Sequence, residues 1–192
     1  MSKTDAGKQA RLDAIAEELR GHVPCGFAIC EEATNLVPGE GNPDADVVFV
    51  GEAPGANEDK HGRPFIGSAG KLLDELLAEA DLVRADIFIT NVVKARPPKN
   101  RDPKADEIAH HRPWLIGQLE VIEPRFVVPL GRHALGHFAP DAKIGEAHGT
   151  VVPTETWTVF PMYHPAAAIY NRSLRATLSE DARKLAEALA AG

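Results

Sequence analysis

Short apolar runs alternate with segments of helical periodicity along most of this chain, and that alternation constrains its fold more than any other feature. Four apolar runs predict buried strands, and they occupy residues 46–50, 86–90, 125–130 and 157–162. Segments with apolar residues at helical spacing flank these runs, at residues 8–20, 69–80, 104–122, 131–138 and 174–191. Strands that alternate with helices are typical of an α/β fold with a mainly parallel central sheet.

The chain is long enough to bury a core of its own, and we expect a single domain over residues 1–192. Gly21 and Pro24 should end the first helix. Residues 1–9 are polar and no run of eighteen apolar residues occurs, so we expect a cytoplasmic protein without a membrane segment, and a monomer. The net charge of −7 argues against a protein that coats nucleic acid non-specifically, but it allows a local basic patch.

Glycine or polar residues follow each predicted strand. They are Gly51-Glu52, Asn91, Gly131-Arg132 and Tyr163-His164. Ligands of parallel sheets bind outside the carboxyl ends of the strands, so we expect these residues to converge at one edge of the sheet. Two long loops, at residues 51–70 and 96–103, follow the first two strands, and loops of this length inside a compact domain are usually functional.

Three features of this edge have chemistry suited to a nucleobase. Glycines in the turn at residues 51–55 let the backbone approach a ligand closely, although a plain turn with an exposed Glu52 explains the pattern as well. The Asn91 amide can donate and accept together, as a pyrimidine edge requires, and its alternative role is that of a cap or turn residue. His164 could donate a hydrogen bond to a developing oxyanion or could be structural.

The flanking loops add a candidate stacking platform and candidate phosphate contacts. Phe65 is a flat ring in a polar loop, where it could stack on a base or anchor the loop. Backbone amides around Ser68, at the start of a helix, suit a phosphate, with a plain N-cap as the alternative. Basic residues in two loops are either phosphate contacts or solvated side chains: Lys94, Arg96, Lys99 and Arg101 in one, Arg172 and Arg175 in the other.

Three motifs, in their order and spacing, resemble the signatures of the family 4 uracil-DNA glycosylases. The first combines Gly51-Glu52-Ala53-Pro54-Gly55, Glu58-Asp59 and Gly62-Arg63-Pro64-Phe65-Ile66-Gly67. The second is Thr90-Asn91-Val92-Val93-Lys94 with Arg96-Pro97-Pro98 and Asn100-Arg101-Asp102-Pro103. The third is Tyr163-His164-Pro165-Ala166-Ala167 with Asn171, and the similarity extends from about Thr34 to the C-terminus.

The resemblance implies a three-layer α/β sandwich with a central four-stranded, mostly parallel sheet, and a monofunctional DNA repair enzyme. Such an enzyme flips deoxyuridine out of single- or double-stranded DNA, hydrolyses its N-glycosidic bond and leaves an abasic site. The implied catalytic residues are Glu52, Asn91 and His164. The implied substrate-binding residues are Gly51, Ala53, Gly55, Phe65, Ser68 and Asn91, and the implied DNA-binding residues are Lys94, Arg96, Arg101, Pro165, Ala166 and Arg172.

Individual roles follow from the same resemblance. Phe65 would stack on the flipped uracil, and Asn91 would hydrogen-bond its edge. His164 would stabilise the departing uracil anion, while Glu52 would polarise water or stabilise the oxocarbenium-like sugar. The loop at residues 165–172 would enter the minor groove and hold the strand open.

The cysteines depart from the family pattern. Members of this family usually hold a 4Fe–4S cluster with four cysteines. This chain has only two, Cys25 and Cys30, and they are separated by four residues. Ala95 occupies the third cluster position and His111 the fourth. A conventional four-cysteine cluster within one chain is therefore excluded.

Three explanations of the altered cysteine region are open. One is a cluster held by the two cysteines, His111 and a further ligand, and another is a zinc site that combines the cysteines with a pair from His110 and His111. The third explanation is that hydrophobic packing, by Phe27 and Trp114, replaces the cluster. We favour the third, and so expect no metal or cofactor.

Two other functions are open. A non-catalytic member of the same fold would bind uracil-containing or damaged DNA without turnover, although the complete set of candidate catalytic residues argues against it. A nucleotide-handling enzyme on a flavodoxin-like sheet is disfavoured because the chain has neither G-x-x-x-x-G-K-[ST] nor G-x-G-x-x-G. A related branch traps the sugar through a histidine in an added basic loop, and no such insertion lies between Asn100 and Asp106.

Overall fold

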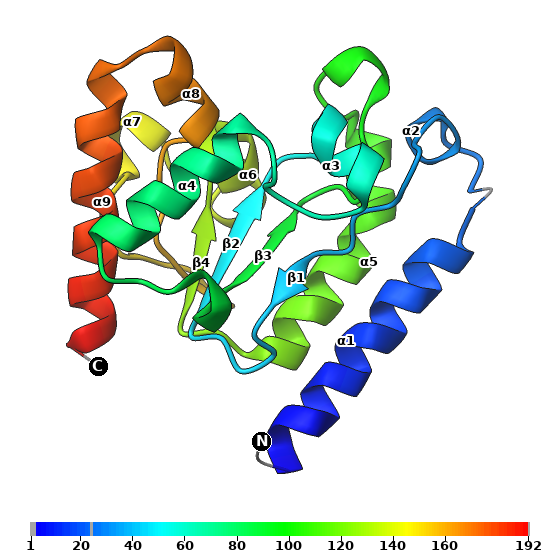
Figure 1. Cartoon of the computed structure of the whole chain (residues 1–192), viewed down its shortest axis with the longest axis horizontal. Helices are drawn as coiled ribbons and strands as arrows, with labels where there is room; N and C mark the ends of the chain where they lie inside the picture. The colour runs from blue at the N-terminus through cyan, green and yellow to red at the C-terminus, as the bar shows by residue number, and fades with distance from the viewer. Residues whose placement is uncertain (1–2, 24, 192) are drawn as a thin grey trace.

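The computed structural model describes residues 3–23 and 25–191, and their strands form one central sheet (Figure 1). The strands lie in the order β1-β3-β2-β4-β6-β5. Their bounds are Glu40–Gly41 for β1, Val47–Gly51 for β2, Phe88–Asn91 for β3, Phe126–Pro129 for β4, Val152–Pro153 for β5 and Thr158–Val159 for β6. The inner strands β3, β2, β4 and β6 run parallel, whereas β1 and β5 are antiparallel to their neighbours.

The predicted α/β class is confirmed, but the predicted number of four strands is wrong, because the described residues form six. The two added strands have two residues each, which is too short to show an apolar period. The strand predicted at residues 157–162 is also shorter than expected. Only Thr158–Val159 pair in a ladder, Pro161 has no N–H to continue it, and Leu130 and Met162 then form an isolated parallel bridge.

Helices cover both faces of the sheet. Their bounds are Lys3–Gly21 for α1, Ala28–Glu31 for α2, Ala56–His61 for α3, Ser68–Glu79 for α4, Ala105–Ile122 for α5, Gly131–Phe138 for α6, Ile144–Ala147 for α7, Pro165–Tyr170 for α8 and Ser173–Ala190 for α9. The first helix ends at Gly21 as predicted, and Pro24 lies outside the described residues. The segment predicted as a loop at residues 165–172 instead begins with a short helix, α8.

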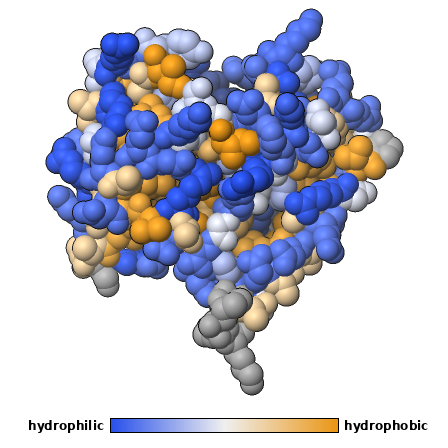
Figure 2. Space-filling model, in the orientation of Figure 1, coloured by the Kyte–Doolittle hydropathy of each residue, from blue (hydrophilic) through white to orange (hydrophobic). Residues whose placement is uncertain are grey.

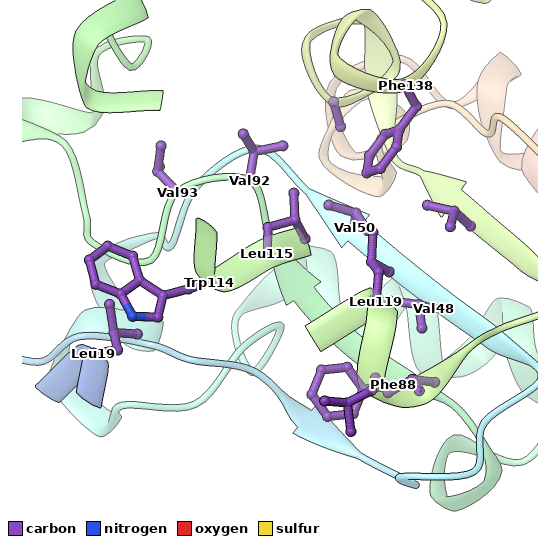
Figure 3. Packing of buried hydrophobic residues seen from close by; sticks show 14 of the residues in the cluster. Leu19, Val48, Val50, Phe88, Val92, Val93, Trp114, Leu115, Leu119 and Phe138 are labelled. Carbon is purple, nitrogen blue, oxygen red and sulfur yellow. The ribbon is translucent and has the colours of Figure 1, made fainter. Parts of the chain in front are cut away.

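The side chains of the strands alternate between two cores, one on each face of the sheet. On β2, Val48 and Val50 belong to the core under α1, α5 and α6, whereas Val47 and Phe49 belong to the core under α4 and α9. Figure 3 shows the first of these cores, with labelled side chains from α1, β2, β3, α5 and α6: Leu19, Val48, Val50, Phe88, Leu115, Leu119 and Phe138. Two packed faces fix the register of the sheet and hence the positions of its strand ends.

The face of the molecule seen in Figure 2 carries mostly hydrophilic side chains, with hydrophobic ones scattered among them. Within residues 3–23 and 25–191, no helix combines the length and the apolar character needed to cross a bilayer. Among the large hydrophobic residues that stay exposed, Ile169 and Tyr170 are neighbours at the end of α8, and Tyr170 is 91% exposed.

Candidate active site

The carboxyl ends of the parallel strands bring the predicted residues to one edge of the sheet. Gly51 at the end of β2 pairs with Asn91 at the end of β3. The backbone N–H of Gly131 donates to the carbonyl of Met162 at 2.8 Å, which places the end of β4 beside Tyr163 and His164. The four strand ends therefore meet, as the topology of a parallel sheet requires.

Gly51, Asn91 and Phe65 border one region at the strand ends, where they pack closely together. A Cβ atom added to Gly51 would lie 2.4 Å from Asn91 Oδ1 and 2.7 Å from Phe65 Cζ, so only glycine allows this close approach. Asn91 Oδ1 is buried and has no hydrogen-bond partner among the described residues. An unpaired buried acceptor costs about 1–3 kcal/mol, which a donor on a bound ligand would recover. This region thus brings together a flat ring, an unpaired amide oxygen and the buried backbone of Gly51.

Phe65 is held in an unusual backbone conformation, with φ of +50°. Two contacts fix it there. Glu58 Oε1 accepts hydrogen bonds from the backbone N–H groups of Ile66 at 3.0 Å and Gly67 at 2.8 Å. Gly70 lets the first turn of α4 approach, because a Cβ there would lie 1.7 Å from the Phe65 carbonyl oxygen. No local sequence pattern predicts this role of Glu58, because it depends on the folded loop.

His164 lies next to this region, with its ring centroid 5.8 Å from that of Phe65. Its Nδ1 accepts a hydrogen bond from the Ala166 backbone N–H at 3.1 Å, so the proton of the neutral ring is on Nε2. Burial lowers the pKa of His164 to about 4, although the negative charge of Glu58 acts in the opposite direction. The ring is therefore a neutral Nε2–H donor at neutral pH.

Glu52 is half-buried directly after β2, and its Oε1 lies 3.5 Å from His133 Nδ1. Burial raises the pKa of the Glu52 carboxyl group, while His133 lowers it. A cavity of about 340 Å³ opens here, and its walls include Glu52, Gly131, His133, Tyr163 and His164. His133 was missed at the sequence level, where only its place on the helix after the third strand could have suggested it.

Residues 38–190 match the uracil DNA glycosylase superfamily. The chain belongs to this superfamily. It is 46% identical over 188 residues to the type-4 uracil-DNA glycosylase of Sulfurisphaera tokodaii, covering 92% of this chain and 84% of that protein. It is 47% identical over 191 residues to the type-4 enzyme of Saccharolobus solfataricus, with 93% and 86% covered, and 40% identical over 183 residues to that of Thermotoga maritima, with 92% and 94% covered.

One predicted DNA contact of this glycosylase-family chain is wrong. Lys94 is fully buried, and its Nζ donates to Thr90 Oγ1 at 2.5 Å, Gln118 Oε1 at 2.7 Å and the Asn91 carbonyl at 2.9 Å. Burial lowers the pKa of Lys94 well below its ordinary value. The side chain points into the core rather than toward a phosphate, and it braces the end of β3 from which Asn91 projects.

The other predicted binding residues differ in accessibility. Arg172 is exposed beyond the end of α8. Arg96 Nε donates to Asn100 Oδ1 at 2.7 Å, and the Arg101 guanidinium forms two hydrogen bonds with the Glu107 carboxylate, at 2.6 and 2.8 Å. That pairing raises the pKa of Arg101 and occupies much of its hydrogen-bonding capacity.

The remaining predicted residues lie at the ends of helices or in the turn after β2. Ser68 is exposed as the first residue of α4, but its side chain does not cap the helix, whose N-cap is Gly67. Pro165 and Ala166 form the first turn of α8, with His164 as the N-cap. Ala53 and Gly55 are half-buried in the turn, where Ala53 packs against the core under α5.

The cysteines lie where α2 meets α5, rather than at the strand ends. Cys25, Cys30 and His110 each offer one ligand atom, and these three atoms all lie within 4.8 Å of one another. His111 does not belong to this group, although its Nε2 lies 3.4 Å from Cys30 Sγ. Burial raises the pKa of the Cys30 thiol. These side chains could hold a single metal ion, but they cannot supply the four thiolates of a conventional 4Fe–4S cluster.

A larger cavity, of about 630 Å³, lies between α5, α6 and the β5–β6 hairpin. Its lining includes Arg112, Phe138 and Trp157, and it contains none of the predicted site residues. The candidate active site is therefore the edge at the strand ends, where Glu52 and His164 line the smaller cavity and Gly51, Asn91 and Phe65 pack together beside His164.

Proposed function

We propose that this protein removes uracil from DNA by hydrolysing the N-glycosidic bond of deoxyuridine, which leaves an abasic site. The observation that carries the proposal is the convergence of the Gly51 backbone, the unpaired Oδ1 of Asn91 and the ring of Phe65, with His164 beside them. Membership of the superfamily supports it, as do the names of the relatives, which are type-4 uracil-DNA glycosylases.

Recognition begins when the nucleotide leaves the duplex, because its glycosidic bond is inaccessible inside the base stack. The extruded base stacks on Phe65, a contact worth about 1–3 kcal/mol. The free Asn91 Oδ1 accepts from N3–H of uracil, and the amide nitrogen donates to O4. Cytosine presents an unprotonated N3 and an amine in these places, so both hydrogen bonds are lost and the buried amide opposes its binding.

Bond cleavage leaves an electron pair on the base and a positive charge on the sugar. As the bond from C1′ to N1 breaks, charge develops on O2 of the uracil anion, and the Nε2–H of His164 donates to that oxygen. A neutral donor suits this step, because it stabilises the developing anion through a hydrogen bond and carries no charge of its own. Glu52, as a carboxylate, stabilises the cationic sugar and orients a water molecule. The oxygen of this water adds to C1′, and one of its protons passes to Glu52.

DNA is held by the segment that follows His164. Pro165 and Ala166 start α8 at the edge of the site, and the exposed Ile169 and Tyr170 at its far end supply an apolar wedge for the emptied base stack. Arg172 and Arg96 contact the phosphates on either side. The same chemistry acts on single- or double-stranded DNA, and it needs no 4Fe–4S cluster, since no named group belongs to the cysteine region.

The test uses a labelled duplex with one U·G pair, followed by alkaline cleavage of abasic sites. Single-turnover rates are compared for the natural protein, Asn91→Ala, His164→Ala and the control His137→Ala, whose side chain is exposed on α6. We expect uracil-dependent cleavage by the natural protein and the control, and a loss of about 10²–10³-fold in His164→Ala. Binding of the U·G duplex without cleavage by the natural protein would favour a non-catalytic DNA-binding role instead.

A further inference from the structure

The region where relatives of this family hold an iron–sulfur cluster has a different donor set in this chain. Its two thiols belong to Cys25 and Cys30, and the third cluster position is the fully buried Ala95. His111 occupies the fourth position and is itself completely buried. A cluster with four thiolate ligands therefore does not fit, and the two thiols and the neighbouring histidines are the donors that remain.

His110 supplies a nitrogen that has no partner of its own. Its Nε2 is buried and makes no hydrogen bond within the part of the chain that the structure describes. The ring cannot easily turn to find one, because it stacks on Phe27 at 4.5 Å and meets the edge of Trp114 at 5.5 Å. An orphaned buried nitrogen is destabilising unless a bound group satisfies it. A ring nitrogen of His110 and the two thiol sulfurs all lie within 4.8 Å of one another.

We propose that Cys25 Sγ, Cys30 Sγ and a ring nitrogen of His110 bind one Zn²⁺ ion. Two thiolates and an imidazole are typical ligands of tetrahedral zinc, and soft sulfur donors disfavour Mg²⁺ and Ca²⁺. The three ligand atoms lie within 4.8 Å of one another, and tetrahedral zinc with its usual bond lengths would hold them about 3.5–3.8 Å apart. Cys25 is half-buried, so the fourth position opens toward solvent and takes a water molecule.

His111 supports this site without being a ligand. Its Nδ1 accepts the backbone N–H of Lys94 at 2.9 Å, so the proton of the neutral ring is on Nε2. That Nε2–H faces Cys30 Sγ at 3.4 Å and stabilises the thiolate as a second-sphere donor. The sequence also allows His111 as a ligand and favours apolar packing by Phe27 and Trp114. In the zinc site proposed here, those two rings orient His110.

The ion would tie α2 and the residues just before it to the first half of α5, and Figure 1 shows α2 next to α5. It lies outside the candidate active site, and its role is structural. The inference does not depend on the glycosylase proposal, because zinc content and cobalt spectra are measured without any DNA substrate.

The experiment uses the untagged full-length protein, purified under reducing conditions. Elemental analysis should find about one zinc per chain. Replacement by Co²⁺ should give the intense visible bands of a tetrahedral ion and a thiolate-to-cobalt charge-transfer band. Both signals should be lost in Cys30→Ser and His110→Phe, and Phe preserves the stacking on Phe27. They should persist in His61→Ala, which removes an exposed histidine of α3.

Three results would overturn the inference. One is folded protein without zinc that also fails to develop the cobalt bands, which requires no variant to interpret. Another is iron accompanied by acid-labile sulfide, which would mean that a cluster forms with other ligands. The third is a mass two hydrogens lower than expected even after purification under reducing conditions, which would show a Cys25–Cys30 disulfide.

Discussion

Replacing Gly51 by alanine adds a single methyl group at the point where Asn91 and Phe65 meet. The new Cβ would lie 2.4 Å from Asn91 Oδ1, about 1 Å closer than ordinary van der Waals contact. Asn91 is fixed in β3 and the Phe65 loop is held by Glu58, so neither can withdraw without disturbing the base-binding region. A displacement of about 1 Å of a positioning group costs about 10²-fold in rate. We therefore expect excision to fall by at least about 10²-fold.

Stability should change far less, because overpacking of this kind costs about 1–3 kcal/mol. The assay combines single-turnover excision of uracil from a U·G duplex with thermal unfolding. Gly136→Ala is the matched control, since a Cβ at that position of α6 meets no atom within 4 Å. Excision by folded Gly51→Ala at the natural rate would refute the assignment of this region to the base.

Three further predictions concern the other groups. Glu52 acts as a carboxylate, and burial raises its pKa above the ordinary value of 4.5. Single-turnover rates should therefore fall on acidification while the pH is still above 4.5, and Glu52→Gln should remove that pH dependence. The same loss of rate at acidic pH in the variant would exclude Glu52 as its source. Lys94→Met removes the lysine donor from three buried acceptors, so calorimetry should show a loss of about 1–3 kcal/mol, while the salt dependence of DNA binding stays unchanged. Arg172→Ala should leave stability nearly unchanged but lower the slope of log K for DNA binding against log salt by about one. An unchanged slope would exclude Arg172 from the DNA interface.

The inner strands and the strand-end residues were predictable because both depend on local sequence. Continuous apolar runs reveal β2, β3 and β4, and a parallel sheet then brings Gly51, Asn91 and His164 to one edge whatever the details of the loops. The outer strands β1 and β5 were not predictable, because a two-residue strand exists only through the neighbour with which it pairs.

Side-chain roles that depend on tertiary partners could not be predicted from the sequence either. Lys94 follows the strand end like a surface cation, and nothing local reveals that Gln118, on a distant helix, accepts its hydrogen bond inside the core. Glu58 is eight residues from Ile66, and its hydrogen bond to that backbone exists only once the loop has folded back. The same holds for His110, because the cysteines that lie near it come from another segment of the chain.

The bracing of Phe65 by Glu58 has a consequence for turnover. Hydrogen bonds within the protein hold the stacking ring of Phe65 beside the Asn91 amide, so a released uracil molecule meets the same complementary surface as a base still attached to its sugar. Product would then compete with the next lesion for an identical surface. Weakening the Glu58 hydrogen bonds should therefore relieve inhibition by free uracil at the same time as it slows excision.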